Sequence, residues 1–167
     1  MYVVDFLRSR HVEFETLLHR PASSSERLAG SVHVPGRAVA KSVLVRAGES
    51  LCLAILPATS RVDFERLAQA LGRPGGEVRM ATPEELESTF VDCEPGAVPP
   101  FGRLYGIPSI VDESLARCET IVLRANTLHQ GVRMRFPDFE CLEAPLIGSF
   151  AGPILGPSSR PSRRRAG

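Results

Sequence analysis

Two runs of aliphatic and β-branched residues lie close together in the first third of the chain and restrict the folds it can adopt. Residues 39–45 and 51–56 each have the length of a strand, and Ala47-Gly48-Glu49 between them is short enough for a turn. We predict that the two runs pair as an apolar hairpin. A fold whose core is built around a sheet follows from this.

Lys41 interrupts the first of these runs. Alternation along a strand places Lys41 on the same face as Val39, Val43 and Val45, where an ammonium group is costly unless it reaches solvent or a partner. It is also the only lysine in a chain with nineteen arginines. Two interpretations stay open. Lys41 either protects an exposed sheet edge or, as we favour, places a cation at the rim of a pocket that binds a phosphate or a carbonyl.

Short helices and strands alternate irregularly along the chain, which predicts a single α+β domain with a mixed, mostly antiparallel sheet flanked by helices. Expected helices cover 2–10, 23–33, 63–71, 113–116 and 137–142, and another begins at Thr82-Pro83. Expected strands, besides the hairpin, cover 11–17, 78–80, 110–112, 120–124 and 132–135. We expect the domain to span residues 1–152 and residues 153–167 to form a disordered basic tail.

Charge is unevenly distributed between these two parts. The net charge is +1, but the expected tail carries four arginines and no acid, which leaves the domain at −3. The domain is therefore not a general polyanion binder, and any affinity for nucleic acid must come from a local patch or from the tail. No apolar run could span a membrane and the N-terminus does not resemble a signal peptide, so we expect a cytoplasmic protein. The four cysteines are widely spaced, so a metal site is not expected. No cofactor is expected either.

Residues 93–108 contain four prolines and three glycines and are predicted to form a long loop. Its central part is Gly96, Ala97, Val98, Pro99 and Pro100. A glycine lets the backbone approach a ligand closely, while prolines stiffen the chain. Such a loop can bind an oxyanion or position water through its backbone groups. A Pro/Gly loop alone is a weak signal, and a purely structural connection stays open.

Asn126, the only asparagine, and His129 lie in a predicted turn before Gly131. Turn chemistry is a sufficient reason for the asparagine, and His129 is equally consistent with a surface position and a pocket position. No phosphate-binding GxxxxGK[ST] or HExxH motif is present. A cysteine hydrolase built on Cys93 would need a histidine partner that the sequence does not identify.

Several segments, in this order, resemble the YbaK / prolyl-tRNA-synthetase-associated domain family of aminoacyl-tRNA deacylases. They are Leu18-His19-Arg20-Pro21-Ala22, Val39-Ala40-Lys41-Ser42-Val43, Gly96-Ala97-Val98-Pro99-Pro100-Phe101-Gly102 and Ile110-Val111-Asp112-Glu113-Ser114-Leu115, followed by the turn with Asn126 and His129. The resemblance covers residues 1–145. The basic tail lies outside it.

The resemblance implies an enzyme that hydrolyses the ester bond of mischarged aminoacyl-tRNA, with a small amino acid such as Ala, Cys or Ser on tRNA(Pro), because a synthetase pocket discriminates weakly against a smaller occupant. It implies that Lys41 anchors the 3′-terminal nucleotide and that residues 96–100 form the reaction-side loop. Phe101, Gly102, Asn126 and His129 are implied to contact substrate. Aminoacyl-tRNA and prolyl-tRNA synthetase are the implied partners, with no metal and no membrane. The alternative is a non-catalytic module of the same fold that binds tRNA or a protein.

Overall fold

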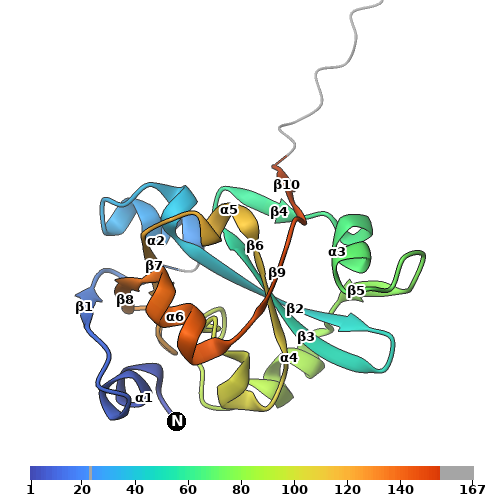
Figure 1. Ribbon diagram of the computed structural model, residues 1–167. Coiled ribbons are helices and arrows are strands. Elements are labelled where there is room, and N and C mark those ends of the chain that lie inside the picture. Colours follow the sequence, from blue (N-terminus) through green and yellow to red (C-terminus); the bar gives the residue numbers. More distant parts are fainter. Residues whose placement is uncertain (23, 155–167) are drawn as a thin grey trace, which may run out of the picture.

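The computed structural model describes residues 1–22 and 24–154 (Figure 1). Its α-helices are α1 (Val3–Ser9), α2 (Ser25–Ser31), α3 (Phe64–Ala70), α4 (Pro83–Thr89), α5 (Glu113–Ala116) and α6 (Phe136–Glu143), and two 3₁₀ turns are η1 (Gly36–Ala38) and η2 (Gly102–Tyr105). Its strands are β1 (Phe14–Leu18), β2 (Ala40–Ala47), β3 (Ser50–Pro57), β4 (Ser60–Val62), β5 (Val78–Met80), β6 (Ser109–Asp112), β7 (Thr120–Arg124), β8 (Gln130–Arg135), β9 (Leu146–Gly148) and β10 (Ala151–Pro153).

The predicted hairpin is confirmed and lies at the centre of a five-stranded sheet. β2 and β3 pair antiparallel from Ala40 opposite Pro57 to Ala47 opposite Ser50, and Gly48 takes the positive φ of +63° that the turn between them requires. The full strand order is β5-β2-β3-β6-β9. β5 pairs antiparallel with β2, whereas β6 and β9 add in parallel, so the sheet is mixed.

Two further sheets complete the fold. β1, β8 and β7 form an antiparallel three-stranded sheet, and β4 pairs antiparallel with β10. A single parallel bridge between Val39 and Val122 connects the three-stranded sheet to the start of β2. The prediction of an α+β domain with mixed, mostly antiparallel pairing is confirmed. Strands β4, β9 and β10, of three residues each, were not predicted; β5, equally short, was.

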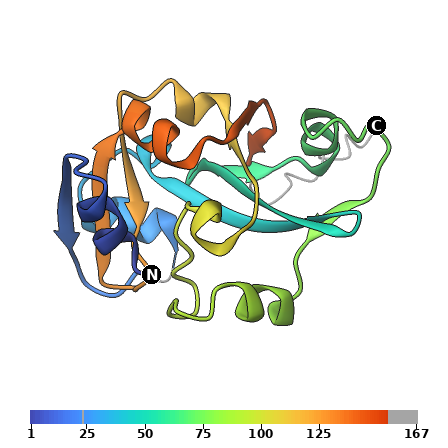
Figure 2. The same ribbon diagram turned by 60° about the horizontal axis from the view of Figure 1, so that its bottom comes forward.

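Alternation along the hairpin divides the apolar residues between two layers. Ala40 and Leu44 of β2 face a large core with α1, α6 and the inner side of the three-stranded sheet. Val45 faces the other way, into a smaller cluster that α3 closes with Leu67. Figure 2 shows the resulting arrangement, with α5 and α6 on one side of the β2–β3 hairpin and α4 on the other.

Capping side chains start the helices where the sequence predicts. Thr82 and Glu85 form a reciprocal capping box at α4, and Pro83 occupies the first turn. Asp63 caps α3 by accepting from the Arg66 N–H, and Ser24 caps α2 by accepting from the Arg27 N–H.

The expected start of the basic tail coincides with the last described strand. Pro153, the last residue of β10, is the register partner of Ser60 in β4. The prediction of a disordered tail otherwise concerns residues 155–167, which lie outside the described residues. Over residues 1–22 and 24–154, no helix is long and apolar enough to cross a membrane.

Candidate functional site

A cavity of about 190 Å³ lies beside the part of β2 that is paired on one side only. β3 accompanies β2 along its whole length, but β5 pairs with it only from Val45 onward, and the bridge to β7 lies at Val39. The outer edge of β2 between these points therefore borders the cavity. The lining residues come from α2, β2, β5, α4, the 93–108 loop and β7: Ser25, Ser42, Val43, Leu44, Met80, Ala81, Leu86, Gly96, Val98 and Arg124.

Gly96 reaches this cavity from a type II turn. The Ala97 N–H donates to the Glu94 carbonyl over 2.8 Å, Pro95 occupies the second turn position, and Gly96 follows with a φ of +84°. A type II turn requires a positive φ at its third position and so favours glycine there. Local sequence alone therefore accounts for the turn that brings this backbone to the cavity.

Long-range hydrogen bonds hold the turn in place. The Glu94 N–H donates to the Asn126 carbonyl over 2.9 Å, and the Glu94 Oε2 accepts from the Leu128 N–H at 2.6 Å. The loop that carries Gly96 and the turn after β7 are thus joined through both the backbone and the side chain of Glu94.

The residues that follow Gly96 anchor the loop in the core. Ala97, Pro99 and Pro100 are buried, whereas Val98 is partly exposed and lines the cavity. The Phe101 side chain has no exposed surface, and its ring lies edge-on to Phe6 and Phe139 at centroid distances of 5.8 and 5.3 Å. The expectation that Phe101 contacts substrate does not fit this position, because its ring is enclosed by the core.

Gly102 is likewise buried. Its N–H donates to the Glu143 Oε1 at 2.9 Å, and a Cβ would lie 2.7 Å from the Ile107 carbonyl oxygen. Close packing within the chain is therefore sufficient reason for a glycine at this position. The contact of Gly102 with substrate stays a prediction.

Asn126 holds three segments together from a buried position. It is 1% exposed and takes a φ of +49°. Its Oδ1 accepts from the Val3 N–H at 2.8 Å, and its Nδ2 donates to the Tyr105 hydroxyl at 2.9 Å and to the Cys93 Sγ at 3.3 Å. These contacts make Asn126 a positioning residue for the loop, rather than one whose amide is open to the cavity.

Lys41 points away from the side of β2 that carries Ser42 and Leu44. Its Nζ donates to the carbonyl of Ser60 at the start of β4. Burial lowers the pKa of Lys41, and the negative charge of Glu26 partly offsets that shift. The ammonium group is therefore near Glu26 of α2 and engaged by a backbone carbonyl, and Lys41 is not among the residues that line the cavity.

His129 is exposed, and its carbonyl accepts from the His19 N–H at 3.0 Å. It lies in the turn that Glu94 binds, but it is not among the residues that line the cavity. The structure thus brings Gly96 and Val98 to the same cavity wall as Ser42, and it places the His129 side chain outside that group.

Arg124, which no sequence pattern singled out, is a lining residue of the cavity. It is 3% exposed, and its Nη1 and Nη2 donate to the carbonyls of Ala22 and Ser24 at 2.6 and 3.0 Å. Burial lowers its pKa. The local signal was weak, because one arginine at the end of an apolar strand does not stand out among nineteen.

A second cavity, of about 260 Å³, lies behind the loop and shares Leu86, Gly96 and Val98 with the first. Cys93 lines it and contacts the Tyr105 hydroxyl at 3.2 Å. Burial raises the pKa of the Cys93 thiol, which disfavours the thiolate that a cysteine nucleophile needs. The arrangement does not favour a cysteine hydrolase. Within the described part of the chain, no group of three or more His, Cys, Asp or Glu residues is placed to hold a metal ion.

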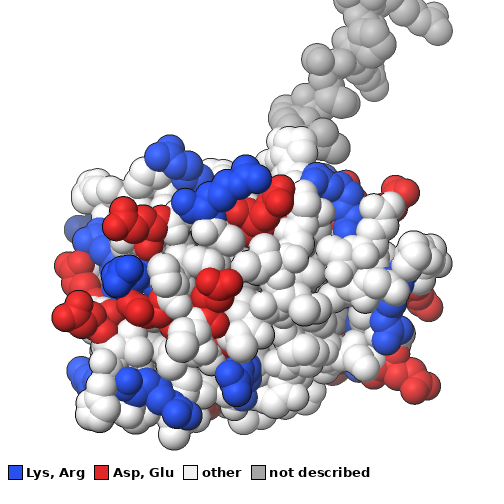
Figure 3. Space-filling model, viewed as in Figure 1, with Lys and Arg blue, Asp and Glu red and all other residues white. Residues whose placement is uncertain are grey.

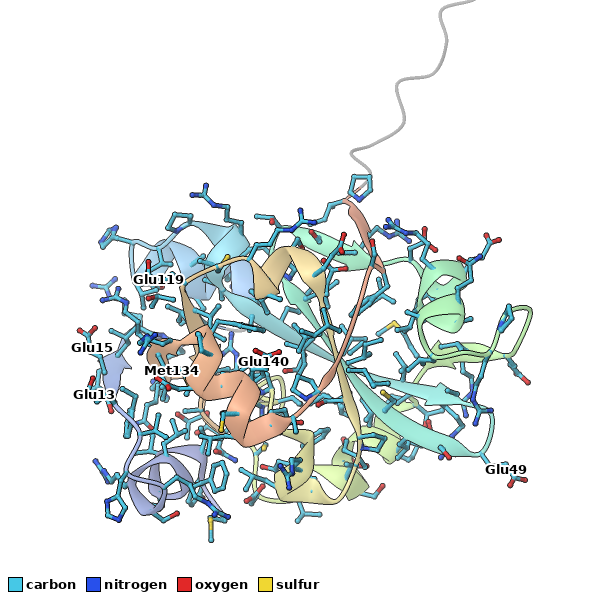
Figure 4. All side chains as sticks on the ribbon, in the orientation of Figure 1. Glu13, Glu15, Glu49, Glu119, Met134 and Glu140 are labelled. Atoms are coloured by element: carbon cyan, nitrogen blue, oxygen red, sulfur yellow. The ribbon has the colours of Figure 1, made fainter. Side chains whose placement is uncertain are left out.

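The face seen in Figures 3 and 4 has a different character from the cavity. Acidic and basic side chains are interspersed on its left, over β1 and α6 (Figure 3). Glu13 immediately precedes β1, Glu15 lies on β1, and Glu140 lies on α6 (Figure 4).

Comparison with known structures finds the same fold in proteins of low sequence identity. A hypothetical protein named APE2540 superimposes with a TM-score of 0.80 at 16% identity, covering 90% of this chain and 99% of the other. A structure described as a "putative trans-editing enzyme for prolyl tRNA synthetase" has a TM-score of 0.75 at 22% identity, with 90% and 94% covered. A scaffold used for computational grafting of linear epitopes has a TM-score of 0.75 at 19% identity, with 90% and 95% covered.

Sequence comparison with curated proteins finds no match. The family model of the aminoacyl-tRNA editing domain, in contrast, matches residues 19–142. That range contains the β2–β3 hairpin, the loop with Gly96 and the turn after β7, which are the segments that carried the resemblance to YbaK-type deacylases. The chain belongs to the family of aminoacyl-tRNA editing domains.

Proposed function

We propose that this protein hydrolyses the ester bond between a tRNA and a wrongly attached amino acid, at the cavity beside β2. The observation that carries the proposal is Gly96, which lines that cavity with a φ of +84° in a chain of the editing family. The turn exposes backbone rather than a side chain to the cavity. An aminoacyl ester is an activated bond, so positioning and electrostatic stabilisation by backbone groups can be sufficient for its hydrolysis.

We assign the reaction-side loop to residues 96–100. Gly96 and Val98 lie on the cavity wall, and the buried Ala97, Pro99 and Pro100 keep the loop rigid behind them. In this proposal the loop orients the aminoacyl group, and water attacks its carbonyl carbon with help from the ribose hydroxyl of the substrate. Asn126 contributes by holding Glu94 and hence the turn.

We assign the 3′-terminal nucleotide to Lys41. Its ammonium group is close to Glu26 of α2, the helix whose Ser25 lines the cavity, and it donates to the Ser60 carbonyl, a neutral acceptor that a phosphate can replace with a charge-assisted contact. His129 is proposed to contact the substrate from the rim, because it is exposed in the turn that binds the loop.

The proposed amino acids are small, such as Ala, Cys or Ser, and the proposed carrier is tRNA(Pro). A cavity of about 190 Å³ is below the range of about 300–1,000 Å³ typical of drug-sized ligands, so it suits a short acyl group. The structural neighbour described as acting for prolyl-tRNA synthetase is the reason for favouring tRNA(Pro) and for proposing that synthetase as a partner.

A deacylation panel tests the proposal. Single-turnover hydrolysis is measured on tRNA(Pro) charged with Ala, Cys, Ser or Pro, and on tRNA(Ala) charged with Ala. We expect rapid release of at least one small amino acid from tRNA(Pro) and little release of Pro. Binding of these tRNAs without hydrolysis of any would favour the alternative function, a non-catalytic binding module.

A further inference from the structure

Arg124 places a positive charge in the wall of the cavity, and its hydrogen bonds within residues 1–22 and 24–154 go to uncharged groups. Its partners there are the carbonyls of Ala22 and Ser24. A guanidinium has more donors than these two bonds use. A buried charge is costly unless it is paired, so a cation left with backbone carbonyls favours the arrival of an anion.

Ser42 contributes a second polar group that lacks a partner. Its Oγ is buried and has no hydrogen bond within the described part of the chain, and Ser42 lines the same cavity. Buried hydroxyl groups are satisfied in most native structures, so this one calls for an explanation. Ser42 and Arg124 thus provide two donors in the lining of one cavity for the oxygen of a ligand.

The other lining residues and the volume of the cavity restrict the kind of ligand that it can hold. Val43, Leu44, Met80, Ala81, Leu86 and Val98 give the cavity an apolar lining apart from Ser25, Ser42, Gly96 and Arg124. At about 190 Å³ it suits an aminoacyl group better than a nucleotide with its phosphate. In an aminoacyl ester, the group that gains negative charge during hydrolysis is the carbonyl oxygen.

We propose that Arg124 and Ser42 bind the carbonyl oxygen of the aminoacyl ester and stabilise it as it becomes an oxyanion. The inference rests on the deacylase function proposed above and adds two catalytic residues to it. Water adds to the carbonyl carbon, and the carbonyl electron pair moves to the oxygen beside Arg124 and Ser42. The pair then returns, the bond to the ribose 3′ oxygen breaks, and the proton lost by water ends on that oxygen. The products are the free amino acid and an uncharged tRNA.

Ser42→Ala is the decisive variant, because removing an unsatisfied buried hydroxyl should not destabilise the fold. We expect an unchanged or higher melting temperature together with a single-turnover rate at saturating tRNA that is lower by at least about tenfold, as for other oxyanion donors. Ser42→Thr keeps the hydroxyl and should retain most of the rate. Ser50→Ala, at the exposed start of β3, is the matched control and should behave as wild type.

Arg124→Lys and Arg124→Gln form the second arm. Lysine keeps the charge and should retain more of the saturated rate than glutamine, after correction for the folded fraction of each variant. Both lose bonds to Ala22 and Ser24, so the Ser42 variants remain the readout if folding suffers.

The outcomes separate this inference from the proposed function. A wild-type protein that hydrolyses none of the mischarged tRNAs would overturn both. An active wild type with Ser42→Ala at the same saturated rate would overturn only the oxyanion site. A Ser42→Ala protein that binds uncharged tRNA more weakly but keeps the saturated rate would place a tRNA phosphate in the cavity, which also overturns it.

Discussion

Different properties restrict which residue can occupy each position around the cavity, and at Gly96 that property is the backbone conformation. Its φ of +84° is one that an L-residue adopts only with strain. Ala97, its neighbour, is fully buried, so even a serine at that position would introduce a polar group into the core. The sharpest test of the loop is therefore a glycine substitution with a matched conformational control.

We expect Gly96→Ala to lower single-turnover deacylation by at least about tenfold while costing roughly 1–2 kcal/mol of stability, because the Cβ strains the turn at the cavity wall. Gly72→Ala is the control. Gly72 has a φ of +69° and open space where a Cβ would lie, so the same strain occurs without contact to the cavity. Thermal unfolding and deacylation are measured on both. Parallel loss of activity in the two variants would show that Gly96 only makes a turn.

Lys41 is constrained by its charge. We expect Lys41→Ala to lower deacylation at limiting tRNA by at least about tenfold, the scale of one charge-assisted hydrogen bond. The fold should tolerate the change, since the ammonium group contacts a carbonyl rather than an acid. Arg133→Ala, in β8 beside Glu15, removes a cation that does not line the cavity and should leave activity unchanged. Wild-type kinetics in Lys41→Ala would remove the anchor from the mechanism.

At the scale of elements, α4 matters because it supplies Leu86 to both cavities. Glu85 fixes this helix by accepting from Arg79, from the Thr82 N–H and from Arg46 of β2. These bonds, with that to Arg79 first, lower the pKa of Glu85 to about 2. Through Glu85 the helix is tied to the sheet that borders the site.

This pKa gives the stability a defined dependence on pH. Because the folded-state pKa is below the ordinary value of 4.5, the stabilisation by Glu85 is complete above pH 4.5 and is lost as pH falls toward about 2. We expect Glu85→Gln to lower the melting temperature at pH 7, with the difference from wild type shrinking between pH 4.5 and 2. Glu84→Gln, at an exposed neighbouring position, should show a much smaller effect. A difference that stays constant across this range would contradict the assignment.

At the scale of the whole molecule, positive charge is concentrated in the C-terminal segment, and the rest of the chain is net negative. Residues 155–167 contain Arg160, Arg163, Arg164 and Arg165 and no acid, whereas the remainder has a net charge of −3. Long-range attraction for tRNA is therefore expected to come mainly from the arginine-rich segment.

We expect deletion of residues 155–167 to weaken tRNA binding and to make its salt dependence shallower, by up to about 3 in the log–log slope for four lost cations. The deletion starts after Ile154 because Pro153 belongs to β10. Single-turnover hydrolysis at saturating tRNA should change little. Substituting the four arginines by glutamine should reproduce the deletion, and a collapse of the saturated rate in either variant would place the segment within the site.

Local chemistry was enough to predict much of this molecule. The β2–β3 hairpin, the capped start of α4 and the glycine-dependent loop depend on residues close together in the chain, where propensity, capping and turn rules apply. The order of the segments around Lys41 and Gly96 also identified the family that the comparison confirms. Interactions between residues that are close in the chain can be predicted from sequence, because few alternative local conformations compete with them.

Which side chains are buried, and which distant groups they bond to, was decided only by the tertiary structure. The enclosure of Phe101 by Phe6 and Phe139, and the bond from Lys41 to Ser60, depend on segments brought together by the fold. Arg124 became notable only when β7 placed it in a cavity wall, bonded to the carbonyls of a distant segment. A side chain's partners across long separations depend on how the three sheets pack, and that packing has no signature in the neighbouring residues.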